Sequence, residues 1–108
     1  MIRIKIKGSP DRVEGFMIRG HARYAPGGED VVCAGVSAIA TTALLGLADY
    51  VPGYFRYSLL PQGLIYCRLS PVLPADRVSD AQVILQVMVL GLMAIRDIYK
   101  GYIDIAYM

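Results

Sequence analysis

An uncharged run at residues 31–48, bounded by Asp30 and Asp49, is the feature that most constrains the fold. It is just long enough to cross a lipid bilayer as a helix. However, the run is rich in small and hydroxylated residues, and it lacks the flanking basic clusters and Trp residues that are typical of membrane spans. We therefore interpret it as a buried helix that packs on a sheet, and we expect no membrane partner.

The segments around this helix alternate apolar and polar residues, as half-buried strands do. Isoleucine occupies every second position from Ile2 to Ile6, with Arg or Lys between. Turn-forming residues at 8–11 join this segment to a second apolar one, which predicts an antiparallel hairpin. A second hairpin is expected around the turn at 61–63, and a last strand near the end of the sequence. The predicted strands cover residues 2–7, 12–19, 54–59, 64–69 and 102–107.

Two helices are predicted, at about residues 31–50 and 80–100. Asp30 can cap the first, which ends before Pro52. After a loop at 71–77, Ser79 and Gln82 form a capping-box pattern at the start of the second, and Gly101 ends it. The order β-β-α-β-β-α-β predicts one α+β domain over residues 1–108, with a largely antiparallel sheet and both helices packed on one face.

The composition narrows the function classes. A formal net charge of only +2 gives no strong nucleic-acid footprint, so we expect that no direct nucleic-acid binding is required. The N-terminal residues show no secretory signal, and two cysteines without one favour a cytoplasmic protein with reduced thiols. One His and two distant Cys give no zinc-ligand spacing, and no phosphate-binding Gly motif precedes a helix, so no metal or cofactor is expected.

The residues that carry chemistry lie at 20–34. His21 follows the second predicted strand, and Cys33 lies in the first turn of the first predicted helix. The loop between them is long enough to fold back, so the two side chains can approach each other. A helix N-terminus and a protonated imidazole both favour a thiolate, the nucleophile of acyl transfer, and the free N–H groups can bind an oxyanion. On spacing alone, a buried cysteine and a structural histidine are the alternative.

This segment resembles the signature of the ribosomal-processing cysteine protease family, formerly a family of unknown function. That signature begins Gly-His-Ala and continues through a short Gly-containing loop to Asp-(Ile/Val)-Val-Cys-Ala and then Val-Ser. The loop here, with Pro26-Gly27, is richer in Gly and Pro than the family's pattern. The matching residues are Gly20-His21-Ala22, Gly28, Asp30-Val31-Val32-Cys33-Ala34 and Val36-Ser37.

The resemblance implies a homodimeric cysteine endopeptidase that needs no cofactor. Its substrate would be large-subunit ribosomal protein number twenty-seven, from which it would remove a short N-terminal extension after a hydrophobic, Phe-containing stretch. Cys33 would be the nucleophile and His21 its base. A mobile loop would clamp the substrate peptide, a role that falls on Ala22, Arg23, Tyr24, Ala25, Pro26, Gly27, Gly28 and Glu29.

Other residues near the dyad each have two interpretations. Asp30 caps the helix, which its position favours, or it orients His21. Ser37, one helical turn after Cys33, hydrogen-bonds near the site or back to a helix carbonyl. Cys67 lies among apolar strand residues and is expected in the core.

Two further functions are alternatives to proteolysis. A non-catalytic module would dock on the ribosome or a ribosomal protein without using its thiol, and a redox sensor would oxidise Cys33 without cleaving anything. The basic residues Arg3, Lys5 and Lys7 are interpreted as a solvated strand face, with contact to a ribosomal partner as the alternative.

Overall fold

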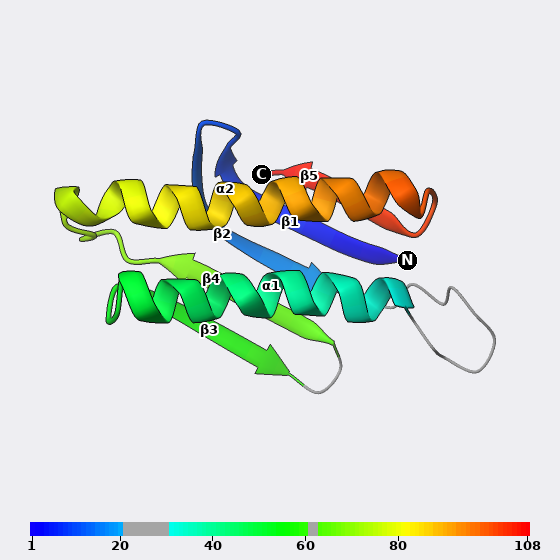
Figure 1. Ribbon diagram of the computed structural model, residues 1–108, viewed down its shortest axis with the longest axis horizontal. Coiled ribbons are helices and arrows are strands. Elements are labelled where there is room, and N and C mark those ends of the chain that lie inside the picture. The colour runs from blue at the N-terminus through cyan, green and yellow to red at the C-terminus, as the bar shows by residue number, and fades with distance from the viewer. Residues whose placement is uncertain (21–30, 61–62) are drawn as a thin grey trace.

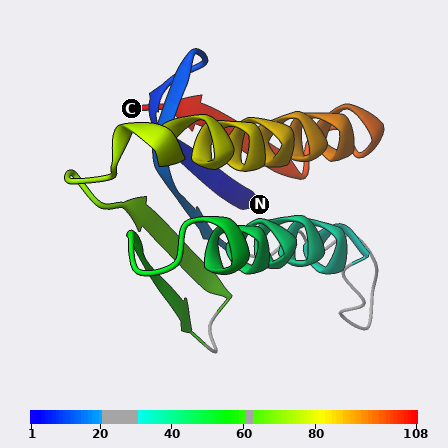
Figure 2. The ribbon, with the colours of Figure 1, turned by 60° about the vertical axis from the view of Figure 1, so that its left-hand side comes forward.

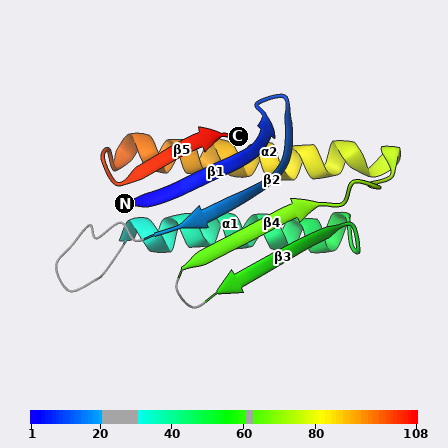
Figure 3. The same ribbon diagram turned by 180° about the vertical axis from the view of Figure 1, so that it is seen from behind.

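The order of elements predicted from the sequence is confirmed. The computed structural model describes residues 1–20, 31–60 and 63–108. Both helices cover one face of the sheet and leave the other without a helix (Figures 1 and 3). The elements are β1 (Ile2–Ser9), β2 (Arg12–Arg19), α1 (Val31–Tyr50), β3 (Phe55–Leu60), β4 (Leu64–Leu69), α2 (Ala75–Ile98) and β5 (Ile103–Tyr107).

The five strands form one sheet in the order β3-β4-β2-β1-β5. Three neighbouring pairs are antiparallel, and only β1 and β5 run parallel. Strands of a parallel pair cannot be joined by a tight turn, and here all the other elements lie between β1 and β5 in the sequence, with α2 directly before β5. The sheet is therefore largely antiparallel, as expected, and the strand that opens the sequence lies between β2 and the last strand.

The helix-covered face of the sheet is apolar because the strand registers align its isoleucines. Ile4 lies opposite Ile18, which lies opposite Ile65. Since side chains alternate between the two faces of a strand, these residues all point toward the helices. Cys67 belongs to this layer, so its predicted place in the core is confirmed. The buried core includes Ile2, Ile4, Ile6, Val13, Phe16, Ile18, Ile65 and Cys67 from the sheet, and Val32, Val36, Ala40, Leu47, Leu85, Met88 and Leu92 from the helices.

The two helices lie side by side and run in opposite directions (Figure 2). By length and composition alone, both α1 and α2 could cross a membrane. Their inner sides, however, are buried as part of one core cluster with the strands. This supports the interpretation of both as core helices, although their outer sides are also apolar.

The start of the second helix differs from the prediction. α2 begins at Ala75, so residues 75–77 are helical and Ser79 lies within the helix. Pro74 is the N-cap with φ of −62°, and no side chain caps the helix there. Asp76 places a negative charge in the first turn, which favours the positive end of the helix dipole. The capping box predicted at Ser79 and Gln82 is therefore wrong, and the helix ends at Ile98, slightly earlier than predicted.

Gln82 ties α2 to the sheet instead. Its Oε1 accepts a hydrogen bond from the Val13 N–H at 2.8 Å, and its Nε2 donates to the Val13 carbonyl at 2.7 Å. Gln86 Nε2 donates to the same Gln82 Oε1 at 3.0 Å. The ladder between β1 and β2 changes register just there, between Lys7 and Gly8. The partly buried Gln82 amide thus pairs with both backbone groups of Val13.

Candidate active site

Cys33 is the third residue of α1, and its half-buried side chain packs against the edge of the core. Backbone N–H groups in the first turn of a helix have no partner within the helix, and the positive end of the dipole lies there. α1 has no acidic residue in its first turn to offset this field. The thiol therefore lies beside N–H groups that can bind the oxyanion of an acyl-transfer intermediate.

Cys67 has the opposite environment. Its side chain is 1% exposed, and burial raises the pKa of the Cys67 thiol to about 12. It therefore stays protonated at neutral pH, and a protonated thiol is a poor nucleophile. Both cysteines are thiols rather than halves of a disulfide. Of the two, Cys33 is the one whose position suits covalent chemistry.

Gly20, the residue before His21, must be a glycine because of its backbone conformation and its close contact with Met1. Gly20 has φ of +100°, and a Cβ at this position would collide with the carbonyl oxygen of Met1. Glycine alone fits such a conformation and such a close approach. The end of β2 is therefore held against the start of β1. His21 itself, Asp30 and the predicted substrate loop at 22–29 lie outside the described residues.

The turn between α2 and β5 lies next to the start of β1, which Gly20 also contacts. The Ile2 N–H donates a hydrogen bond to the Tyr102 carbonyl at 2.9 Å, so this turn adjoins the strand start that Gly20 contacts. In Figures 1 and 3, the end of β2, the start of α1 and the turn before β5 all lie at one end of the molecule. Gly20 and Val31, the described residues on either side of 21–30, therefore both lie at that end.

A contact between the two helices holds the start of α1 against the end of α2, close to the turn before β5. An added Cβ at Gly35, two residues after Cys33, would lie 2.9 Å from Ile95 Cδ1, so glycine allows the Ile95 side chain to approach α1 closely. The Tyr99 N–H donates to the Ile95 carbonyl at 2.9 Å and closes the last turn of α2. Ile95, Tyr99 and Tyr102 are not among the predicted site residues. The feature of the sequence that could have pointed to them is the pair of tyrosines on either side of Lys100-Gly101, where the second helix ends.

Ser37 lies one turn after Cys33 on α1, and its side chain is exposed. Within residues 1–20, 31–60 and 63–108 its hydroxyl makes no hydrogen bond, so it does not bond back to a helix carbonyl. Thr42 shows what such a bond looks like, because its Oγ1 donates to the Ala38 carbonyl at 2.7 Å. A supporting role of Ser37 beside the thiol stays a prediction.

The described part of the chain contains no group of three His, Cys, Asp or Glu side chains placed to hold a metal ion. The chemistry that this end of the molecule offers is that of a thiol at a helix N-terminus. In the sequence, His21 follows Gly20 at the end of β2, which lies at the same end of the molecule.

Comparisons with known proteins agree with this chemistry. The family model described as cysteine protease Prp matches residues 1–104. The chain is 31% identical over 112 residues to the ribosomal processing cysteine protease Prp of Bacillus subtilis (strain 168), covering 93% of this chain and 91% of that protein.

Solved structures give the same result. The fold is similar to that of an essential ribosomal processing protease Prp from S. aureus in complex with a covalently linked product peptide, with a TM-score of 0.81, 26% identity and full coverage of both chains. It is also similar to the S. aureus protease in complex with a substrate peptide, with a TM-score of 0.79, 25% identity and again full coverage of both.

Proposed function

This chain belongs to the cysteine protease Prp family, and from that membership we propose that it removes a short N-terminal extension from large-subunit ribosomal protein number twenty-seven. Cys33 is the nucleophile and His21 the base. The observation that carries the proposal is the position of Cys33 in the first turn of α1, at the end of the molecule where Gly20 fixes the backbone before His21. Two reduced thiols are consistent with work in the cytoplasm.

The proposed reaction proceeds through a thioester. His21 takes the proton of the Cys33 thiol, and Sγ attacks the carbonyl carbon of the scissile peptide bond. Free N–H groups in the first turn of α1 stabilise the oxyanion that forms. His21 then gives its proton to the leaving amine as the C–N bond breaks. Water, deprotonated by the same imidazole, hydrolyses the thioester and releases the extension with a new carboxylate.

Substrate selection is assigned to the residues that follow His21. Cleavage occurs after a hydrophobic, Phe-containing stretch, and the loop Ala22–Glu29 clamps the peptide over the thiol. Asp30 caps α1 or orients His21, and Ser37 supports the site from the next turn. The similar proteins are ribosomal processing proteases, and two of their structures hold a substrate or a product peptide, which supports a peptide substrate of ribosomal origin.

Mass spectrometry tests the proposed function directly. The protein is incubated with a synthetic peptide that carries the extension and its Phe-containing stretch, with and without prior iodoacetamide treatment. We expect one cut after this stretch, complete loss of cutting after alkylation, and a single adduct on Cys33, because Cys67 is buried and protonated. A matched peptide with Phe replaced by Ala should be cut at least about 10-fold more slowly. Binding without any change of mass, insensitive to alkylation, would instead identify a non-catalytic module.

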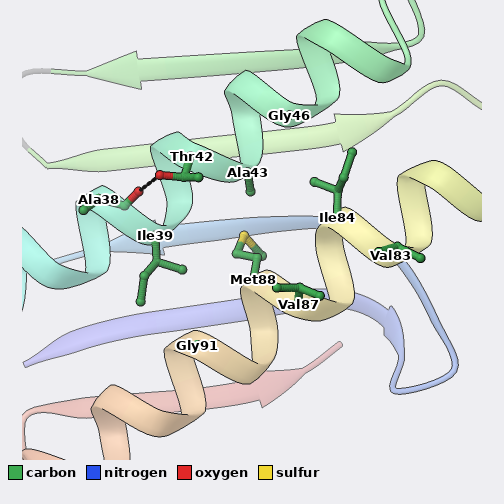
Figure 4. Close-up of a pocket in the computed structure, with 10 residues that line it drawn as sticks. All are labelled: Ala38, Ile39, Thr42, Ala43, Gly46, Val83, Ile84, Val87, Met88 and Gly91. Atoms are coloured by element: carbon green, nitrogen blue, oxygen red, sulfur yellow. Dashed lines mark hydrogen bonds between the residues drawn. The ribbon is translucent and has the colours of Figure 1, made fainter.

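We further propose that the protein is a homodimer formed through the outer sides of its two helices. Four apolar side chains there are between 60% and 66% exposed, and we call them the outer helix face: Leu45, Val83, Val87 and Leu90. Beside them a groove of about 560 Å³ runs between α1 and α2, lined by residues from Ala38 to Gly46 and from Val83 to Gly91 (Figure 4). An exposed apolar surface of this kind is typical of an interface, and a second copy presents a matching one.

Replacing Val87 with glutamate is expected to separate the two copies. The new carboxylate would lie in the centre of an apolar interface, where an unpaired charge is strongly unfavourable. Light scattering after size exclusion should give a dimer for the wild type and a monomer for the variant. Val72→Glu is the matched control, since Val72 is exposed in the loop before α2 and away from the outer helix face. A monomeric wild type, or one that sediments with phosphatidylcholine vesicles, would contradict the dimer.

A further inference from the structure

The charges of this chain are divided between its two layers. The five strands contain seven Lys or Arg residues and only two acids, Glu14 and Asp104. The two helices contain two Arg residues and four Asp residues. A net charge of +2 therefore conceals a strongly basic sheet, and the expectation of no nucleic-acid footprint rested on that total alone.

Six of the strand cations gather on the side of the sheet that no helix covers. Each alternates along its strand with residues that point toward the helices, so its own side chain points the other way. Five are exposed and Lys7 is half-buried. With the two larger side chains between them, they form what we call the open sheet face: Arg3, Lys5, Lys7, Arg19, Arg56 and Arg68, with Met17 and Tyr66.

The registers order these side chains into rows across the strands. In one row Arg56 lies opposite Arg68, which lies opposite Gly15, which in turn lies opposite Lys7. This row crosses four strands, or roughly 14 Å. The next row contains Tyr66 and then Met17 opposite Lys5. An aromatic ring and a thioether therefore lie between cations rather than beside acids.

Among the described residues, the cations of the open sheet face form no ion pair, although Asp104 of β5 lies opposite Arg3 on the same face. Across residues 1–20, 31–60 and 63–108, the ion pair is that of Arg96 with Asp97 in α2, and none of the six sheet cations takes part in one. Like charges directly opposite each other destabilise a sheet, as Arg56 and Arg68 do here. An anionic partner would remove that penalty.

The surface is hollowed where the rows meet. A depression of about 910 Å³ is lined on β3 and β4 by Arg56, Ser58, Tyr66 and Arg68, among others. A smaller one of about 140 Å³ is lined by Lys5 and Lys7 together with the same Tyr66 and Arg68. The two depressions share Tyr66 and Arg68, and their lining residues extend along the cation rows from β3 to β1.

We infer that the open sheet face binds single-stranded RNA. Lys and Arg at intervals across the strands suit successive phosphates, and Tyr66 between them offers a flat surface on which a base can stack. An acidic peptide would match the charge but would leave the half-buried Tyr66 ring unused. The site is separate from Cys33, so RNA binding and cleavage can be measured independently.

Fluorescence anisotropy tests the inference with a fluorescein-labelled, mixed-sequence RNA of about 12 nucleotides. We expect the Arg56→Gln/Arg68→Gln double variant to bind at least about 10-fold more weakly than the wild type. The slope of log K against log salt should fall by about 1.4, since each lost phosphate contact on a single strand contributes about 0.7. Tyr66→Ala should weaken binding by about 5-fold or more without changing that slope.

The matched control removes the same charge from α2 and the turn that follows it. Arg96→Gln/Lys100→Gln should bind RNA within about 2-fold of the wild type, because neither side chain lies on the sheet. All variants should cut the peptide substrate at the wild-type rate, which also shows that they are folded. The inference is overturned if the wild type fails to bind at about 50 mM salt, if both double variants weaken binding equally, or if poly-glutamate displaces the RNA at equal charge concentration.

Discussion

Cys33→Ala is expected to abolish peptide cleavage, with a loss in kcat/KM of at least about 10⁴-fold. The substitution removes the atom that forms the thioester, and no other described side chain at that end of the molecule offers a nucleophile of similar strength. The side chain is only half-buried at the edge of the core, so alanine should fit without disturbing the fold. Cleavage of the extended peptide under single-turnover conditions gives the rate, and circular dichroism gives the melting temperature.

Cys67→Ala is the control for this prediction. It removes an equal sulfur from a fully buried place, so it should lower the free energy of unfolding by about 1–2 kcal/mol. Cleavage should nevertheless persist at temperatures where the protein is folded. Wild-type cleavage by Cys33→Ala would end the proposal of a Cys33 nucleophile, and so would loss of cleavage in a folded Cys67→Ala protein with Cys33 intact.

His21→Ala is expected to lower kcat/KM by about 10²- to 10⁴-fold. Without the imidazole, the thiol loses its proton acceptor and the departing amine loses its proton donor. The reaction of Cys33 with iodoacetamide should slow as well, since the thiolate is the reactive species. Both rates are measured on the same protein, by peptide cleavage and by mass spectrometry of the adduct.

Added imidazole separates a chemical role of His21 from a structural one. A small base that enters the vacated space should restore part of the cleavage rate in His21→Ala, but not in Cys33→Ala. A His21→Ala protein that alkylates and cleaves as the wild type does would rule out His21 as the base. Loss of cleavage together with a lowered melting temperature and no rescue would assign His21 to folding instead.

The secondary structure was predictable because two periodicities dominate the sequence. Isoleucine at every second position of the first segment can bury one face only in a strand, and an uncharged run ending before Pro52-Gly53 can be buried only as a helix. The arrangement of the strands was not predictable in the same way. No local pattern indicates that the last strand, Ile103–Tyr107, pairs in parallel with the first.

The start of α2 shows where local rules give way to tertiary contacts. Ser79 and Gln82 have the spacing of a capping box, yet Gln82 binds both backbone groups of Val13 in β2. A side chain that can satisfy two groups of a packed strand is more useful there than at a helix end. Pro74, with its fixed φ, then determines where the helix starts.

The site could be predicted only as a sequence of residue types. The order of His21 and Cys33 and the signature around them identify the family, which the comparisons confirm. The surroundings of the thiol depend on residues far away in the chain, such as Ile95 against Gly35. The basic character of the sheet was likewise hidden, because the acids of the helices and loops offset part of its charge in the total for the chain.

The pairing of the first strand with the last also determines when a newly made molecule can work. Ile2 lies beside Ile103, and its N–H is bonded to the Tyr102 carbonyl at 2.9 Å. Neither contact exists until Tyr102 and Ile103 have been synthesised, so the support of the strand start behind Gly20 forms after both helices have been made. We therefore expect each molecule to gain its cutting ability only once this strand has emerged from the ribosome.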